Sequence, residues 1–139
     1  PSVLLATDYH ARLYNLKFMD LCAKAGCEKL YSYLFAFEFP YFGGMPAWHG
    51  AELPFAFHNT KSVPICNKRG VTERLERQVA SAWVQFARTG DPTNESLPAW
   101  PAYRTGREAT MVLDEVSGVR YDYDRELVEW IEKTAPWFH

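Results

Sequence analysis

The chain has 139 residues, the length of one domain or of part of one. Its 15 basic and 17 acidic residues give a net charge of −2, so it lacks the basic excess that nucleic-acid binding requires. Apolar residues (47%) and charged residues (23%) occur at the levels of soluble globular chains, which excludes a disordered or fibrous protein. Aromatic residues make up 16%, more than so short a domain can easily enclose, so we expect some rings to pack against something outside the chain.

The first predicted element is a helix over residues 8–25. Thr7 and Asp8 are favourable N-cap residues, and Gly26 is a favourable end. Apolar side chains recur along it with the spacing of one helical face. They are Tyr14, Phe18, Leu21, Cys22 and Ala25.

A strand is predicted over residues 30–39, where every odd position from 31 to 39 is aromatic and most even positions are apolar. Two apolar faces are typical of a strand covered on both sides in an α/β sheet. Such a strand needs neighbours, and this chain supplies few. The Gly- and Pro-rich segment 40–48 ends it and leaves His49 in or just after the following loop.

The rest of the chain predicts a short helix near 52–57, an irregular stretch over 59–70, and a long helix from Thr72 to Gly90. Leu75, Val79, Trp83 and Phe86 line one face of that helix. A turn-rich segment over residues 91–101 follows, in which Trp100 is the large apolar side chain. Two short strands near 110–113 and 119–123 then flank a turn, before a last helix over 124–134. No repeat or linker divides residues 1–139.

Four histidines are candidates for chemistry: His10, His49, His58 and His139. In open α/β sheets, reactive groups gather in the loops beyond the carboxyl ends of strands. His49 follows the most strand-like segment across a Gly-Gly loop. Its position in the chain therefore makes His49 the preferred candidate for a catalytic histidine.

Metal, cofactor and membrane-span motifs are missing. Cys22, Cys27 and Cys66 leave at least one thiol unpaired, and we interpret them as small buried hydrophobes rather than as metal ligands, because the spacing of the first two does not match a zinc knuckle. The sequence has no phosphate-binding or dinucleotide-binding glycine motif, and no apolar run long enough to span a bilayer. We therefore expect a soluble protein with no metal and no cofactor.

The compartment stays open. No signal peptide is recognisable, but a start at Pro1 rather than Met fits a processed or truncated product, which makes that absence uninformative. The cytoplasm is favoured over secretion.

Three motifs carry a family resemblance. Residues 49–57 read His-Gly-x-Glu-Leu-x-Phe-x-Phe, residues 83–92 read Trp-x-x-Phe-Ala-x-Thr-Gly-x-Pro, and residues 100–103 read Trp-Pro-x-Tyr. In this order they resemble the C-terminal quarter of the type-B carboxylesterase/lipase family, the group of cholinesterases and para-nitrobenzyl esterases. The resemblance covers essentially all 139 residues.

This resemblance implies an α/β-hydrolase fold and a catalytic triad in the order Ser, acid, His, with His49 as its last member. None of the six serines stands in Gly-x-Ser-x-Gly, and no Gly-rich oxyanion segment is present. In the family, the nucleophile, the oxyanion glycines and the acid lie upstream of this region. We therefore expect a C-terminal fragment, inactive alone, whose partners are the missing N-terminal part and a small carboxylic ester. Glu52 is interpreted as a structural anchor of the loop, since this motif glutamate is not the triad acid in the family.

Two alternatives remain. The aromatic residues around Tyr41, Phe42 and Trp48 could form a platform for binding alone, and some members of this family have lost the triad and serve in adhesion. A Gly-x-Ser-x-Gly motif in the parent protein would favour the enzyme. The fragment could also self-associate to cover its open sheet face.

Overall fold

The computed structural model describes residues 8–134. In chain order the elements are the π-helical turn η1 (Asp8–Leu13), α2 (Tyr14–Lys24), β1 (Ser32–Phe35), α3 (Leu53–Ala56), the 3-10 turns η2 (Thr60–Ser62) and η3 (Pro64–Cys66), α4 (Thr72–Thr89), β2 (Ala109–Leu113), β3 (Gly118–Tyr121) and α5 (Arg125–Thr134). The predicted helices and the predicted hairpin are present, but residues 8–13 of the first helix are π-helical, and its expected N-cap Thr7 lies outside the described residues. The irregular stretch contains two short 3-10 turns.

The three strands form a mixed sheet in the order β1-β2-β3. β1 runs parallel to β2 with Tyr33 opposite Met111, and β2 runs antiparallel to β3 with Met111 opposite Val119. The carboxyl ends of β1 and β2 therefore lie at the same edge of the sheet. Within residues 8–134, β1 lies at the edge of the sheet, and its outer side pairs with no described strand.

β1 is shorter than the predicted strand over 30–39. The ladder to β2 ends where the backbone N–H of Ala36 donates to the carbonyl of Leu113 (2.9 Å), because β2 ends there. Beyond that point Phe39 forms a bridge with Met45 instead, which closes the loop over residues 40–44. The aromatic run continues as a loop held by its rings, and Phe37 and Phe39 are fully buried.

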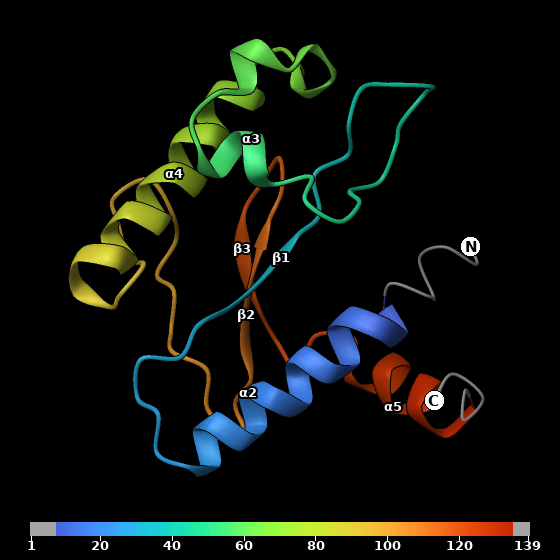
Figure 1. Cartoon of the computed structure of the whole chain (residues 1–139), viewed down its shortest axis with the longest axis vertical. Helices are drawn as coiled ribbons and strands as arrows, with labels where there is room; N and C mark the ends of the chain where they lie inside the picture. The colour runs from blue at the N-terminus through green and yellow to red at the C-terminus, as the bar shows by residue number, and fades with distance from the viewer. Residues whose placement is uncertain (1–7, 135–139) are drawn as a thin grey trace.

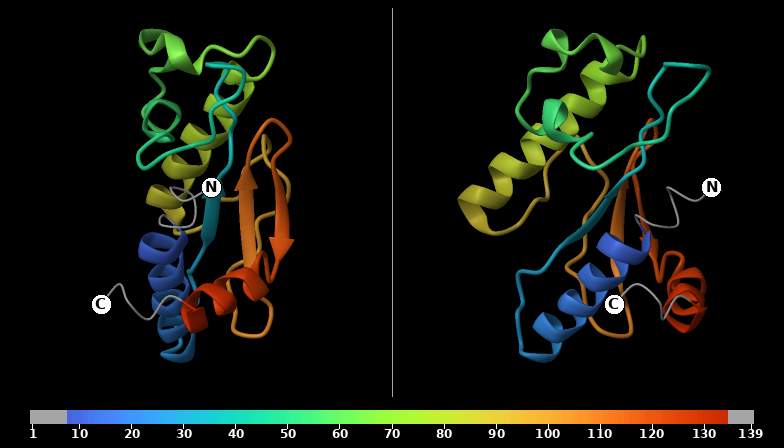
Figure 2. Two further views of the ribbon diagram at one scale, coloured as in Figure 1. Left: turned by 90° about the vertical axis from the view of Figure 1, so that its right-hand side faces the viewer. Right: turned by 45° about the vertical axis from the view of Figure 1, so that its right-hand side comes forward.

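Helices cover both faces of the sheet. In Figure 1 the strands overlap, with α3 and α4 on one side of the sheet and α2 and α5 on the other side, toward its lower end. Figure 2 shows the strands side by side. The main core lies on the α4 face, where Leu75 and Val79 meet Phe35, Met111 and Leu113. A smaller cluster joins η1 to α5.

Two features of the helices differ from simple amphipathic expectation. Phe18 and Leu21, on the predicted apolar face of α2, are 61% and 66% exposed, whereas Met19 is buried. Thr72 is the first residue of α4 rather than its N-cap, and its hydroxyl accepts a hydrogen bond from the backbone N–H of Lys68 (2.8 Å). The C-terminus at Gly90 is as predicted.

All three cysteines are free thiols, and only Cys66 is buried. Cys22 is half-buried and Cys27 is exposed, so the interpretation as small buried hydrophobes is correct for Cys66 alone. None of the helices in residues 8–134 combines the length and apolar character needed to cross a bilayer.

Candidate active site

His49 lies in a tight turn immediately before α3, on the path of the chain beyond the carboxyl end of β1. The turn is closed by the backbone N–H of Ala51, which donates to the carbonyl of Trp48 (3.0 Å). Gly50 occupies its third position with a φ of 79°, the left-handed value that type II turns require there. The side chain of His49 is exposed and has no hydrogen bond or ion pair within the described residues.

Packing on both sides holds this turn in place. Before it, the ring of Trp48 packs on that of Phe39 at 4.5 Å between centroids. After it, Phe55 of α3 is fully buried and contacts Phe35 and Phe37, with centroids 5.1 and 5.3 Å apart. The half-exposed ring of Trp48 and the buried ring of Phe55 therefore hold the backbone on both sides of the exposed imidazole.

Glu52 links the same turn to the sheet. It is the residue before α3, and its carboxylate lies near the phenol of Tyr33 on β1. Burial raises the pKa of Tyr33, and the nearby charge of Glu52 raises it further. The partner of Glu52 within the described residues is thus a strand tyrosine, not His49. Sequence reasoning missed Tyr33, because nothing in the aromatic run distinguishes its hydroxyl.

Of the other three histidines, only His58 has a described side chain. The side chain of His10 and the whole of His139 are outside the part of the chain that the structure describes. His58 follows α3 with a φ of 54°, and its Nδ1 lies 3.6 Å from Oε2 of Glu76. Glu76 is only 4% exposed, and its Oε1 accepts hydrogen bonds from the backbone N–H and the hydroxyl of Thr60, both at 2.8 Å. His58 is the described histidine with a carboxylate neighbour, which makes it the structural rival of His49.

Sequence reasoning also missed Glu76, although the helix offered a signal. Glu76 stands directly after Leu75 and three residues before Val79, on the buried stripe of α4. A carboxylate on such a stripe needs internal hydrogen-bond donors.

The other two motifs meet on the α4 face of β1. Trp83 contacts Tyr33 edge-on at 4.8 Å, and Phe86 and Trp100 contact Tyr31 at 5.9 and 6.3 Å between centroids. These rings line an apolar groove of about 260 Å³. The indole N–H of Trp100 is buried beside Tyr31 without a hydrogen-bond partner among the described residues.

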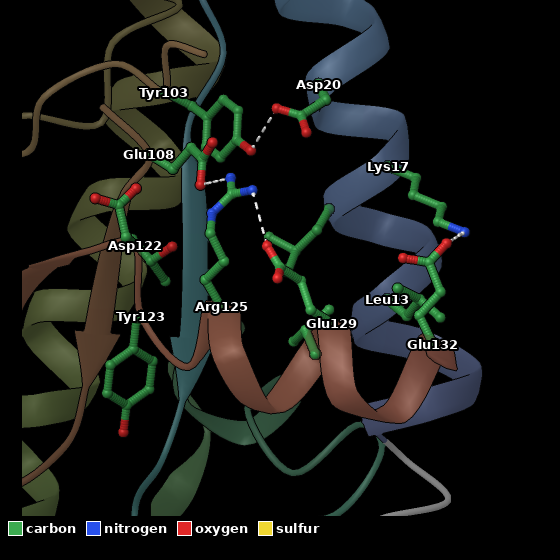
Figure 3. A pocket seen from close by; sticks show the side chains of 13 residues that line it. Leu13, Lys17, Asp20, Tyr103, Glu108, Asp122, Tyr123, Arg125, Glu129 and Glu132 are labelled. Carbon is green, nitrogen blue, oxygen red and sulfur yellow. Dashed lines mark hydrogen bonds and ion pairs between the residues drawn. The ribbon is translucent and has the colours of Figure 1, made fainter. Parts of the chain in front are cut away.

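A smaller cavity of about 110 Å³ lies between α2, α5 and the sheet (Figure 3). The hydroxyl of Tyr103 donates to Asp20 on α2 (2.9 Å), and Arg125 on α5 forms an ion pair with the buried Glu108 and lies 3.9 Å from Glu129. The hydrogen bond and the ion pair tie both helices to the segment that leads into β2. The cavity thus has a structural rather than a catalytic character.

No group of His, Cys, Asp or Glu side chains within residues 8–134 converges as metal ligands would.

The parallel strand, the turn beyond its carboxyl end and the helices on both faces define part of an α/β-hydrolase fold. The family model of the carboxylesterases matches residues 2–129, and the chain belongs to this family. The para-nitrobenzyl esterase of Bacillus subtilis (strain 168) is 31% identical over 129 residues, which are 88% of this chain and 26% of that protein.

Solved structures of esterases are also similar to this chain. An esterase from anaerobic Clostridium hathewayi that can hydrolyse aliphatic aromatic polyesters is 43% identical and superposes with a TM-score of 0.81, over 86% of this chain and 24% of that one. A carboxylesterase of Geobacillus stearothermophilus is 35% identical, with a TM-score of 0.70, over 84% of this chain and 24% of that one. The chain thus spans about a quarter of the length of the relatives it matches.

Proposed function

We propose that this chain is the C-terminal part of a serine carboxylesterase and supplies its catalytic histidine, His49. The observation that carries the proposal is the exposed imidazole, held by a fixed turn beyond the carboxyl end of β1, in a chain of the carboxylesterase family. In this proposal the serine nucleophile, the oxyanion donors and the triad acid belong to polypeptide outside this chain.

In the proposed reaction, one ring nitrogen of His49 takes the proton of a serine hydroxyl as the serine attacks the ester carbonyl. The same nitrogen then returns the proton to the leaving alcohol. The second ring nitrogen donates to a carboxylate, which fixes the tautomer and stabilises the imidazolium as it forms. Glu52 acts on the position of the turn through Tyr33 and takes no proton.

The test is His49→Ala in the parent protein, with His58→Ala as the matched control. Loss of a triad histidine lowers turnover of a short-chain aryl ester by about a thousandfold or more. His58→Ala should stay within about threefold of the parent. Activity of His49→Ala within about tenfold of the parent would sink the assignment, and a collapse of His58→Ala alone would move it to the His58–Glu76 pair.

The isolated 139-residue chain gives a second readout. Without a nucleophile or oxyanion donors it should hydrolyse the aryl ester no faster than free imidazole. Saturable hydrolysis by the isolated chain would contradict the fragment interpretation.

We propose carboxylic esters as the substrate class. The para-nitrobenzyl esterase and the polyester-hydrolysing esterase named above act on esters with aromatic groups, so a para-nitrobenzyl ester and a short aromatic polyester fragment are suitable first substrates.

One observation favours an alternative, a non-catalytic binding module. Phe42 is 90% exposed and packs edge-on against the half-exposed ring of Tyr41 at 4.4 Å, at the tip of the loop that leads to His49. The parent sequence discriminates between the two functions, because only an enzyme needs Gly-x-Ser-x-Gly upstream.

A further inference from the structure

The C-terminus of α2 brings two cysteines together. The helix ends at Lys24, and the chain turns at Gly26, whose φ is 85°. The backbone N–H of Cys27 donates to the carbonyl of Cys22 (3.0 Å), and that of Gly26 donates to the carbonyl of Ala23 (3.1 Å). This pair of hydrogen bonds is the signature of a Schellman motif.

In a Schellman motif, the side chains of the two residues joined by the outer hydrogen bond come into contact. That contact is usually apolar, but here both residues are cysteines. The backbone hydrogen bond between the two residues brings their side chains close together, and the nearby Cys27 raises the pKa of Cys22. Cys22 is half-buried and Cys27 is exposed, so a small reagent can reach the pair, whereas Cys66 is buried.

We propose that Cys22 and Cys27 form a reversible disulfide by exchange with small-molecule disulfides such as oxidised glutathione. The Cys27 thiolate attacks one sulfur of glutathione disulfide, forms a mixed disulfide and releases one glutathione thiolate. The Cys22 thiolate then attacks the Cys27 sulfur, so the Cys22–Cys27 bond forms and the second glutathione leaves as a thiolate. Two protein thiols are oxidised, one glutathione disulfide is reduced to two thiols, and the protons of the protein thiols pass to glutathione.

The closing step should be faster in alkaline solution. Partial burial raises the pKa of Cys22, and the neighbouring Cys27 raises it further. Since the thiolate is the attacking species, ring closure at neutral pH uses a small fraction of Cys22 and accelerates as the pH rises toward that pKa.

The position of Lys24 between the two cysteines gives a direct test on the whole chain. Trypsin cuts after Lys24, so the reduced, alkylated chain releases residues 18–24 and 25–29 as separate peptides. After treatment with oxidised glutathione and alkylation, these peptides should appear as one species that a reductant separates, with Cys66 alkylated. Alkylation of both Cys22 and Cys27, a persistent glutathione adduct, or a cross-link to Cys66 or to a second chain would overturn the proposal.

Three variants assign the roles. Cys22→Ser should stop at a glutathione adduct on Cys27, and Cys66→Ser should close as the unmodified chain does. Gly26→Ala places a side chain at a left-handed φ with no atom within 4 Å of its Cβ, so it strains the cap without a clash and should slow closure about tenfold. Equal closure in Gly26→Ala would overturn the assignment of this pair to the helix cap.

Discussion

At the scale of single residues, Glu52 illustrates how a carboxylate close in sequence to the proposed catalytic histidine, His49, can serve as an anchor. Its carboxylate lies beside the phenol of Tyr33 and so joins the turn of His49 to β1, and Tyr33 in turn contacts the ring of Trp83 on α4 edge-on. Three elements therefore determine where the turn sits. Tyr33 is a positioning residue in this arrangement, since it acts on His49 only through Glu52.

Tyr33→Phe in the parent protein should lower kcat about three- to thirtyfold with little change in KM, because it loosens the turn without touching the substrate. Tyr31→Phe is the matched control: it removes a hydroxyl from the same face of the same segment, but the carboxylate near that hydroxyl is Asp91 and not Glu52. Equal losses in both variants would show a general effect on stability and not a positioning role.

The effect of Tyr33→Phe should not depend on pH in the neutral range. The pKa of Tyr33 is raised above its ordinary value of 10.0, so the hydroxyl stays protonated and its interaction with Glu52 contributes fully below that value. The contribution disappears only as the pH rises through the raised pKa. The ratio of parent to variant kcat should therefore be flat between about pH 6 and pH 9, and a sharp change there would contradict this role.

Gly50 makes a second prediction at this scale. An alanine at its φ of 79° costs about 1–2 kcal/mol, and the turn can relieve that strain by reorienting the peptide next to His49. Gly50→Ala should therefore lower kcat about tenfold. Gly106→Ala carries the same strain, at a φ of 78° in open space, and should reduce stability alone. Comparing kcat with the urea midpoint separates the two effects, and unchanged kcat in Gly50→Ala would show that the turn tolerates strain.

At the scale of elements, the buried carboxylate of Glu76 ties the segment after α3 to α4. Removing it leaves the buried N–H and hydroxyl of Thr60 without an acceptor, so Glu76→Ala should cost about 1–3 kcal/mol of unfolding free energy. Glu73→Ala, at an exposed position of the same helix, should cost about 0.5 kcal/mol. Urea unfolding of the parent protein measures the loss of unfolding free energy in both variants. Similar losses would mean that water replaces the Glu76 carboxylate as the acceptor for Thr60.

The elements that the sequence predicted well are those specified by local chemistry. α4 and α5 have regular apolar spacing, and α4 ends at Gly90 as predicted. The length of β1 depends on where β2 ends, which no local pattern encodes, so its prediction was too long. Likewise, the His49 motif located the candidate site, whereas the Tyr33–Glu52 contact joins residues on separate elements and is visible only in the structure.

At the scale of the whole molecule, the exposed apolar surface has a distribution that fits missing polypeptide. Phe18 and Leu21 stand open on α2, the aromatic groove lies along β1, and the outer side of β1 pairs with no described strand. Since relatives are about four times as long, we propose that upstream polypeptide covers these surfaces. The isolated chain should then bind a hydrophobic dye and self-associate in size-exclusion chromatography, whereas a dye-negative monomer would count against this proposal.

A complementation experiment tests through ester hydrolysis whether upstream polypeptide covers these surfaces. The 139-residue chain, produced together with the rest of the parent protein as a separate polypeptide, should restore ester hydrolysis that neither part shows alone. Replacing Phe18 and Leu21 together by Ser should raise the concentration of chain needed for half-maximal activity about tenfold or more, because association loses apolar burial, but should leave the plateau unchanged. Val116→Ser, 88% exposed on the β2–β3 hairpin, is the control and should behave as the unmodified chain. Equal requirements for the double variant and the control would place the contact with upstream polypeptide on another surface.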